Sequence, residues 1–169
     1  KTIFQLISLL EQCNNPIKIS NNKSKIKFEM ETGVLISKVI DGRFPDYNKV
    51  IPKDNDKILE IKLNEFKNSI ERVTTVSIDR KEGLKMFISK DSVQLSVNNP
   101  NSGEGVENIS AKFNSSDLNI SFNSRYLTDI ASQIENESIV IYLKDPGSPV
   151  LIRGFLDKNS FHVVMPMKI

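Results

Sequence analysis

Apolar and polar residues alternate over residues 59–63, which predicts a half-buried strand. Asn64 follows directly and is the expected N-cap of a helix, because its side chain can accept a hydrogen bond from the first turn. Apolar residues then recur at helical spacing, which indicates a helix with one buried face. That face is expected to carry Phe66, Ile70 and Val73. Three strand-like runs come next, at residues 83–88, 93–97 and 106–113.

The same order of elements returns from Leu118 onward. Apolar residues alternate over 118–122, Asn123 is the expected cap, and a helical stripe follows. The stripe is expected to consist of Tyr126, Ile130 and Ile134. Three more strands are predicted at residues 138–143, 149–153 and 161–167. The pattern therefore indicates an internal duplication of a strand–helix–three-strand unit.

The first part of the chain resembles a third copy of this unit without its first strand. A helical stripe over residues 3–10 precedes three predicted strands, at residues 16–19, 25–30 and 34–40. We therefore expect the chain to begin in the middle of a domain. Units of this kind predict an α+β fold, with antiparallel sheets on one side and paired helices on the other.

The composition is ordinary for a soluble globular protein, with 38% hydrophobic and 26% charged residues. A net charge of +2 is too small to indicate tight binding to nucleic acid or to a membrane surface. We recognise no signal peptide and no apolar stretch near the roughly 20 residues that cross a bilayer. Cys13 is the only cysteine, which excludes an intrachain disulfide and is typical of a reducing compartment. We expect a cytoplasmic protein.

Residue types that build catalytic and metal sites are sparse. His162 is the only histidine and lies in a predicted strand, which disfavours a histidine-based triad or a histidine-rich metal site. Cys13 has no histidine near it in sequence and is more typical of a buried or incidental thiol than of a nucleophile. The two glycines at 103 and 105 are too few for a phosphate-binding loop. The sequence therefore predicts a non-enzymatic protein with no cofactor and no metal.

An apolar run from Val163 to Ile169 ends the chain. In a strand, Val163 and Met165 share one face and Val164 points to the other. Pro166 cannot donate to a ladder, so pairing should fail there and leave the last residues at a sheet edge. Two methionines beside this proline would make an adaptable apolar surface. Taken alone, the run is more typical of a last core strand than of a binding site.

Polar and mildly basic residues are expected on the outer faces of the three helices. No aromatic residues alternate with them to stack on bases. Ordinary solvated helix faces account for the pattern better than a nucleic-acid surface does. If these faces do meet DNA, the contacts should be loose and made to the phosphate backbone. The DNA-facing candidates are Lys1, Gln5, Arg72 and Arg125.

A turn with a proline between two aromatic residues, Asp-Gly-Arg-Phe-Pro-Asp-Tyr, spans residues 41–47. Together with the run 118–126 and the tail 163–167, it closely resembles the bacterial DNA polymerase III β subunits, the replicative sliding clamps. The resemblance extends over the whole chain. It implies that residues 1–56 are the second half of the middle domain and residues 57–169 the complete C-terminal domain. Clamps of this family build each domain from two such units and close six domains into a dimeric ring.

The resemblance also implies a peptide-binding cleft between these two domains. In the family, this cleft receives motifs of the Gln-Leu-x-Leu-Phe kind from polymerases, the clamp loader and repair proteins. Lys49 stands where the family often has arginine, so it keeps the charge but lacks the planar fork. The other wall of the cleft comes from the first half of the middle domain, which this chain does not contain. The matching positions are Pro45, Lys49, Val50, Asn123, Tyr126, Gly147, Pro149, Val163, Val164, Met165, Pro166 and Met167.

Ring closure in the family uses the far side of the C-terminal domain, which corresponds here to Thr75, Val76, Glu104 and Glu107. Family members carry a richer acidic cluster there, so we expect weaker electrostatic support. Because the first domain is absent, we expect this chain alone neither to close the native ring nor to slide on DNA. The leading hypothesis is part of a homodimeric clamp that encircles duplex DNA and confers processivity. The alternative is a clamp-fold peptide-recognition module that never encircles DNA.

Overall fold

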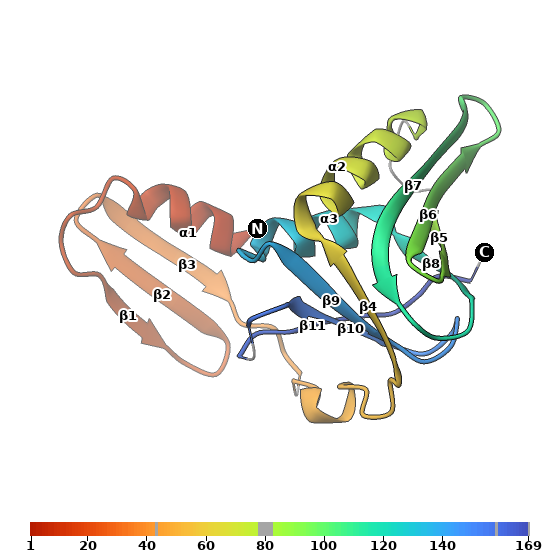
Figure 1. The fold of residues 1–169 in the computed structure, drawn as a ribbon. Coiled ribbons are helices and arrows are strands. Elements are labelled where there is room, and N and C mark those ends of the chain that lie inside the picture. The colour runs from red at the N-terminus through yellow and green to blue at the C-terminus, as the bar shows by residue number, and fades with distance from the viewer. Residues whose placement is uncertain (43, 78–82, 158, 169) are drawn as a thin grey trace. The chain divides into compact units, whose positions relative to one another are not determined.

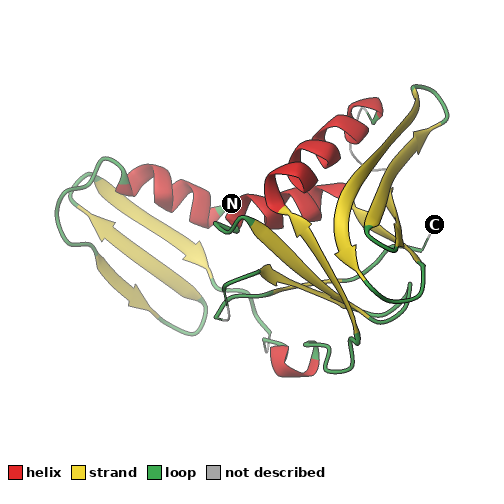
Figure 2. Ribbon diagram, viewed as in Figure 1, coloured by secondary structure: helices red, strands yellow, loops and turns green. Residues whose placement is uncertain are grey.

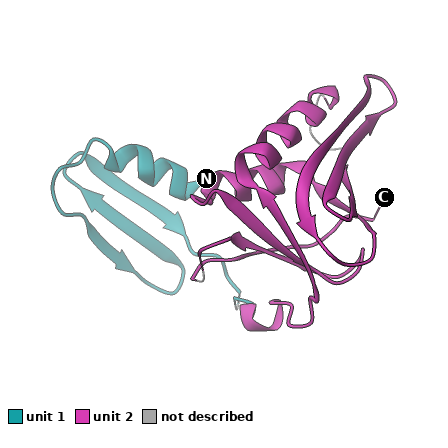
Figure 3. Cartoon of the chain, in the orientation of Figure 1, with its two compact units in different colours: residues 1–45 teal, residues 46–169 magenta. Residues whose placement is uncertain are grey.

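The structure is a computed structural model, and it describes residues 1–42, 44–77, 83–157 and 159–168. Its described strands pair antiparallel and are accompanied by short helices (Figure 2), so the fold is α+β as predicted. The chain divides into two compact units, residues 1–45 and residues 46–169 (Figure 3). The domain boundary that we expected after Asp56 stays a prediction.

The first unit consists of one helix followed by an antiparallel sheet in the order β1-β2-β3. Phe28 and Met30 are its buried apolar side chains, whereas the helix buries none of its residues. Ile3 and Phe4 on that helix are 64% and 78% exposed. The apolar faces of this unit therefore lack a cover within the described part of the unit. Its elements are α1 (Thr2–Leu10), β1 (Lys18–Asn21), β2 (Lys25–Met30) and β3 (Gly33–Lys38).

The second unit contains the duplicated pattern. Its strands form one sheet in the order β11-β10-β9-β4-β7-β6-β5-β8 (Figure 1). The first repeat consists of β4 (Lys57–Lys62), α2 (Leu63–Val73), β5 (Gly83–Ser89), β6 (Ser92–Asn99) and β7 (Gly103–Phe113). The second consists of β8 (Leu118–Asn123), α3 (Ser124–Gln133), β9 (Ser138–Leu143), β10 (Val150–Gly154) and β11 (His162–Val164). Short 3₁₀ helices lie at η1 (Tyr47–Lys49) and η2 (Thr74–Val76).

The two repeats exchange their first strands. Strand β4 of the first repeat pairs with β9 of the second, and β8 of the second repeat pairs with β5 of the first. Helices α2 and α3 lie side by side and turn their apolar faces to one shared core (Figure 1). Because each repeat completes the sheet of the other, neither can bury its apolar face alone.

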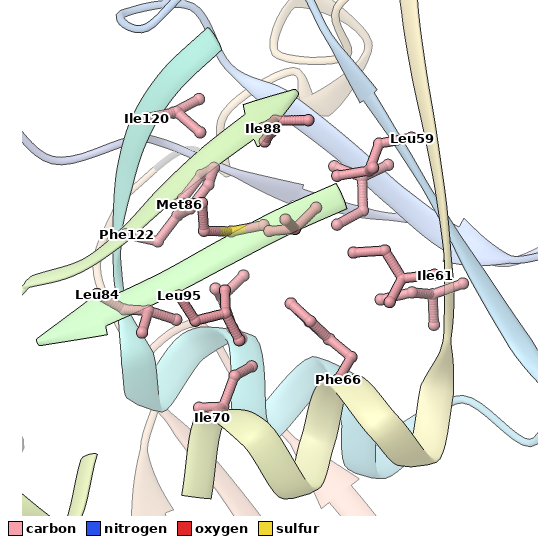
Figure 4. Packing of buried hydrophobic residues seen from close by; sticks show 14 of the residues in the cluster. Leu59, Ile61, Phe66, Ile70, Leu84, Met86, Ile88, Leu95, Ile120 and Phe122 are labelled. Atoms are coloured by element: carbon pink, nitrogen blue, oxygen red, sulfur yellow. The ribbon is translucent and has the colours of Figure 1, made fainter. Parts of the chain in front are cut away.

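The core lies between the helix pair and the inner face of the sheet. Phe66 and Ile70 project from α2 toward side chains of the central strands, including Leu95 (Figure 4). Each of these three residues is at most 1% exposed. Full burial of such side chains stabilises the folded state by about 1.5–3 kcal/mol each. This face of α2 was predicted correctly from its helical spacing.

Asn64 is not the N-cap of α2, contrary to our prediction. The helix begins at Leu63, two residues before the start that a cap at Asn64 would give, and Lys62 occupies the cap position without a side-chain hydrogen bond. The Leu63 side chain is buried and its backbone N–H donates to the carbonyl of Glu137 at 2.9 Å. This contact with the second repeat fixes the start of the helix, and the strand runs into the helix with no separate cap.

The inner face of α3 also differs from the prediction. Leu127 and Ala131 are its buried apolar residues, whereas Tyr126 is 56% exposed. Ile130 and Ile134 are only partly buried at the margin of the core. The apolar arc of this helix is broad, and the packing against α2 buries Leu127 and Ala131, each one position after a residue of the predicted stripe.

Candidate peptide-binding site

The tail that follows β11 alternates between core and solvent. Val164 is 5% exposed and pairs with Val150 of β10, while Val163 pairs with Leu151. Strand pairing ends at Val164, earlier than the predicted end at residue 167, and Met165 is 58% exposed. The early end follows from Pro166, which has no N–H to donate. The tail therefore completes the core with one side chain and leaves the next on the surface.

Beyond Pro166 the tail returns to the sheet at its opposite end. The backbone N–H of Met167 donates to the carbonyl of Ser121 in β8 at 2.7 Å. Strands β11 and β8 are the two outermost strands of the sheet, so this segment bridges from one edge to the other. The C-terminal end of the described chain accordingly lies beside β8 in Figure 1. Met167 is thus held by the backbone, and its side chain is only partly buried.

A hollow of about 620 Å³ lies where the tail meets β8. It brings together two residues of the predicted cleft, Gly147 and Met167. Sequence reasoning missed the rest of its lining. Lys85 is brought to the hollow by the register of β5 against β8, in which it lies opposite Ser121. The missed lining residues are Lys85, Asn119, Ile120, Ser121, Pro146 and Lys168.

The loop that carries Gly147 is held by the carboxylate of Asp145. This carboxylate accepts hydrogen bonds from the backbone N–H groups of Gly147 and Ser148, each at 2.8 Å, and from the Ser148 hydroxyl at 2.7 Å. The hydroxyl bond and then the Gly147 N–H lower the pKa of Asp145 below its ordinary value. The carboxylate is therefore charged at neutral pH and fixes the loop beside the hollow.

Pro149, also predicted for the cleft, is fixed from another direction. The amide nitrogen of Asn55 donates to the carbonyls of Tyr142 and Pro149, at 2.8 and 3.0 Å. The segment before β4 is thereby tied to the ends of β9 and β10. Pro149 is partly buried and directly precedes β10, whose first residue Val150 pairs with Val164.

Asn123 and Tyr126 lie at the start of α3. The side-chain oxygen of Asn123 accepts a hydrogen bond from the Arg125 backbone N–H at 3.0 Å, so Asn123 is the predicted N-cap. This bond leaves the side-chain amide nitrogen as the group that can address a ligand. More than half of the Tyr126 surface is exposed. Its apolar ring and its polar hydroxyl group are therefore both available to a ligand.

The remaining cleft candidates precede β4. Lys49 lies in η1. The Asp46 carboxylate caps this short helix, because it accepts a hydrogen bond from the Asn48 backbone N–H at 3.1 Å. Val50 follows directly and is 49% exposed. Pro45 is exposed and is the last residue of the first unit. Lys49 and Val50 are both exposed, and neither of them lines the hollow.

Among the DNA-facing candidates, Arg72 is already paired. Its Nε donates to the two carboxylate oxygens of Glu107 at 3.0 and 3.1 Å. Its Nη2 donates to Oε1 of the same carboxylate at 2.5 Å and to the Ser69 hydroxyl at 3.1 Å. The arginine lowers the pKa of Glu107 below its ordinary value. Arg125 is exposed at the start of α3. In the first unit, Lys1 occupies the N-cap position of α1 and Gln5 is exposed.

The subunit-interface candidates meet where η2 packs on β7. Thr75 and Glu104 are exposed, and Val76 and Glu107 are partly buried. At Gly105 an added Cβ would lie 2.6 Å from the carbonyl oxygen of Val73, so only glycine allows this approach. Residues 103–110 of β7 pair with β6, whereas only residues 111–113 pair with β4. The first part of β7 therefore has an open edge within the described sheet.

No group of three or more histidine, cysteine, aspartate or glutamate side chains is arranged to hold a metal ion in the described ranges. None of the described helices is long and apolar enough to cross a membrane.

Comparison with known proteins identifies the family to which the chain is similar. The sequence profile described as "DNA polymerase III beta subunit, C-terminal domain" matches residues 48–168. The protein named "Beta sliding clamp" from Caulobacter vibrioides is 34% identical over 169 residues, which are 100% of this chain and 45% of that protein. The Escherichia coli protein of the same name is 28% identical over the same length and is covered to 46%. The chain thus spans about half the length of the curated relatives it matches.

Solved structures give the same result. The crystal structure of a DnaN sliding clamp from Bartonella birtlesii bound to griselimycin superposes with a TM-score of 0.86 and 37% identity. The match covers 99% of this chain and 45% of that one. A sliding clamp from Caulobacter crescentus also reaches 0.86, at 33% identity, with 99% and 45% coverage. The chain therefore belongs to the DNA polymerase III beta subunit family, and its residues 48–168 match the C-terminal domain of that family.

Proposed function

We propose that the protein to which this chain belongs is a bacterial DNA sliding clamp, a non-catalytic ring dimer that encircles duplex DNA and tethers a polymerase to it. Family membership supports this proposal, and the feature of the chain that carries it is the tail after β11. This tail exposes Met165 and holds Met167 at a hollow beside Gly147. A tether of this kind raises the effective concentration of its partners at the template without any chemistry of its own.

The tail and its surroundings suit the capture of short apolar peptide motifs. Each leucine or phenylalanine buried there would contribute about 1.5–3 kcal/mol. Methionines adapt to different partners, and the Asn123 amide and the Tyr126 hydroxyl would orient polar groups. We propose that these residues, with Pro45, Lys49, Val50, Pro149 and the segment 163–167, bind Gln-Leu-x-Leu-Phe motifs of the replicative polymerase, the clamp loader and repair proteins.

The first unit is proposed to be the second half of the clamp's middle domain. Its helix buries no residue, and Ile3 and Phe4 are largely exposed. In the second unit, the apolar face of α2 in the first repeat is covered by residues of the second repeat. The second repeat also supplies β8, which pairs with β5 of the first repeat. A second strand–helix–strand unit would cover the first unit in the same way.

Contacts with DNA and with a second subunit are proposed for different residues: the DNA contacts for both units, and the subunit contacts for the second unit alone. Lys1, Gln5 and Arg125 would face the duplex and contact phosphates loosely. The open edge of β7, with Thr75, Val76 and Glu104, would meet the other subunit. Arg72 and Glu107 form a pair between these two regions, so each is less free for an outside partner than the sequence suggests.

Topological retention on DNA tests the proposal against a peptide-binding module that never encircles DNA. The full-length protein, loaded by a clamp loader on a nicked circular plasmid, should stay bound through gel filtration. Linearising the plasmid should release it, because a ring slides off a free end. A protein that binds peptides but is released equally from circular and linear DNA would contradict the clamp function and support the alternative.

A further inference from the structure

The outer edge of β8 presents backbone groups next to the hollow. Strand β8 pairs with β5 on one side, and on the other side the Ser121 carbonyl accepts from the Met167 N–H. Alternate residues of a strand direct their backbone groups to the same side. The N–H and C=O of Asn119 therefore point toward this open side as well. Among the described strands, none pairs with β8 there.

The tail already occupies one position along the outer edge of β8. One hydrogen bond, at 2.7 Å, attaches Met167 to Ser121, and the hollow continues past it along Asn119 and Ile120. An extended peptide that adds to an exposed strand edge gains main-chain hydrogen bonds in this way. The volume of about 620 Å³ leaves room for several residues beside the tail.

The lining of the hollow is positively charged. Lys85 projects from the outer face of β5 and Lys168 follows the tail, and both side chains are exposed. None of the described lining residues is acidic. The nearest carboxylate in the same loop, Asp145, is already engaged by Gly147 and Ser148. Charge complementarity therefore favours an acidic occupant over a neutral or basic one.

We propose that the hollow binds an extended acidic peptide segment, which adds to the β8 edge beside Met167 and is read by Lys85 and Lys168. The inference rests on the proposed function for the identity of the partner: the segment would flank the apolar motif of a clamp-binding protein. The shared residues Gly147 and Met167 make the hollow continuous with the proposed cleft. Apolar anchors would supply most of the affinity, and the acidic flank would select among partners.

The test measures binding of three fluorescent peptides to the full-length protein by anisotropy. The first peptide carries the Gln-Leu-x-Leu-Phe motif alone. The second adds, at either end of the motif, a four-residue extension in which glutamate and valine alternate. The third has lysines in place of those glutamates. We expect the acidic extension to tighten binding about three- to tenfold at low salt, as two exposed ion pairs allow, and the gain to vanish in 0.5 M salt. Lys85→Glu should abolish the gain, whereas the matched exposed control Lys62→Glu should keep it.

A second measurement separates this inference from the proposed function. The acidic segment without the motif, at millimolar concentration, should shift the amide resonances of Lys85, Asn119 and Ser121. Its N-methylation at alternate residues should remove the shifts, because edge addition needs those N–H groups. Equal binding of acidic and basic extensions, or no shift at the β8 edge, would overturn the inference. Failure of the motif-only peptide to bind, with the edge shifts intact, would contradict only the proposed cleft.

Discussion

Arg72 of α2 and Glu107 of β7 form a side-on ion pair in which the arginine Nε lies 3.0 and 3.1 Å from the two carboxylate oxygens. The two residues were expected in different places, one facing DNA and the other at a subunit interface. The pair fastens the helix to the strand whose first part has an open edge. Arg72 is therefore neutralised locally by its partner.

This pairing predicts that Arg72 contributes less to DNA binding than Arg125 does. In the full-length protein, Arg125→Ala should lower the slope of log affinity against log salt by about one, the value for a lost phosphate contact. Arg72→Ala should change the slope less, because Glu107 already offsets its charge. Equal losses for the two variants would contradict the assignment.

The approach of β7 to the end of α2 predicts a strict requirement for glycine at 105. Gly105→Ala should lower the free energy of unfolding by about 1–3 kcal/mol, because the new Cβ would overlap the Val73 carbonyl. Gly147→Ala is the matched control, since its Cβ would meet only the Asp145 carboxylate at 3.7 Å. Urea denaturation of both variants measures the difference. An unchanged midpoint for Gly105→Ala would show that the packing is looser than described.

The two asparagines that were both expected to cap helices now predict different results. Asn123→Ala should destabilise the chain by about 1 kcal/mol, because it removes the hydrogen bond to the Arg125 N–H. Asn64→Ala should be neutral, since Asn64 is exposed within the first turn and caps nothing. Thermal unfolding of the two variants side by side provides the measurement. Equal destabilisation would restore the original cap assignment.

The hydrogen bonds to Asp145 predict an acid-sensitive loop. They lower the pKa of this carboxyl, so the loop is stabilised above the ordinary pKa of about 3.9 and loses that stabilisation as the pH falls through the lower folded-state pKa. Carbon-detected NMR of the Asp145 carboxyl should give a midpoint below 3.9. The Gly147 amide should shift with the same midpoint. A midpoint at or above the ordinary pKa would contradict this geometry.

Much of the fold could be predicted from local patterns, because strand alternation and helical spacing recur within each repeat. The stripe of Phe66 and Ile70 is an example: burial on one helix face leaves a clear period of 3.6 residues. The start of α2 was missed because its cause is remote, namely the bond from Leu63 to Glu137 in the other repeat. The inner face of α3 was missed for the same reason, since packing on α2 selects Leu127.

The candidate site was predictable in part. Its apolar tail is visible in the sequence, and the position of Pro166 correctly indicated that pairing would stop there. The return of Met167 to Ser121 could not be foreseen, because it joins the two outermost strands of a sheet whose order is set by long-range pairing. Lys85 was missed likewise: only the β5–β8 register brings it to the hollow.

The central claim is that the tail serves binding more than folding, and a combined binding and unfolding measurement on the full-length protein tests it most directly. Isothermal titration with a Gln-Leu-x-Leu-Phe peptide compares the wild type with a Met165→Ala, Met167→Ala variant, and the same samples are then unfolded by heat. We predict that Kd weakens about tenfold or more, with Tm nearly unchanged, because the variant loses two methionine side chains that we propose contact the ligand. A loss of Tm with unchanged affinity would contradict the account, because the tail would then be a core segment and not a binding surface.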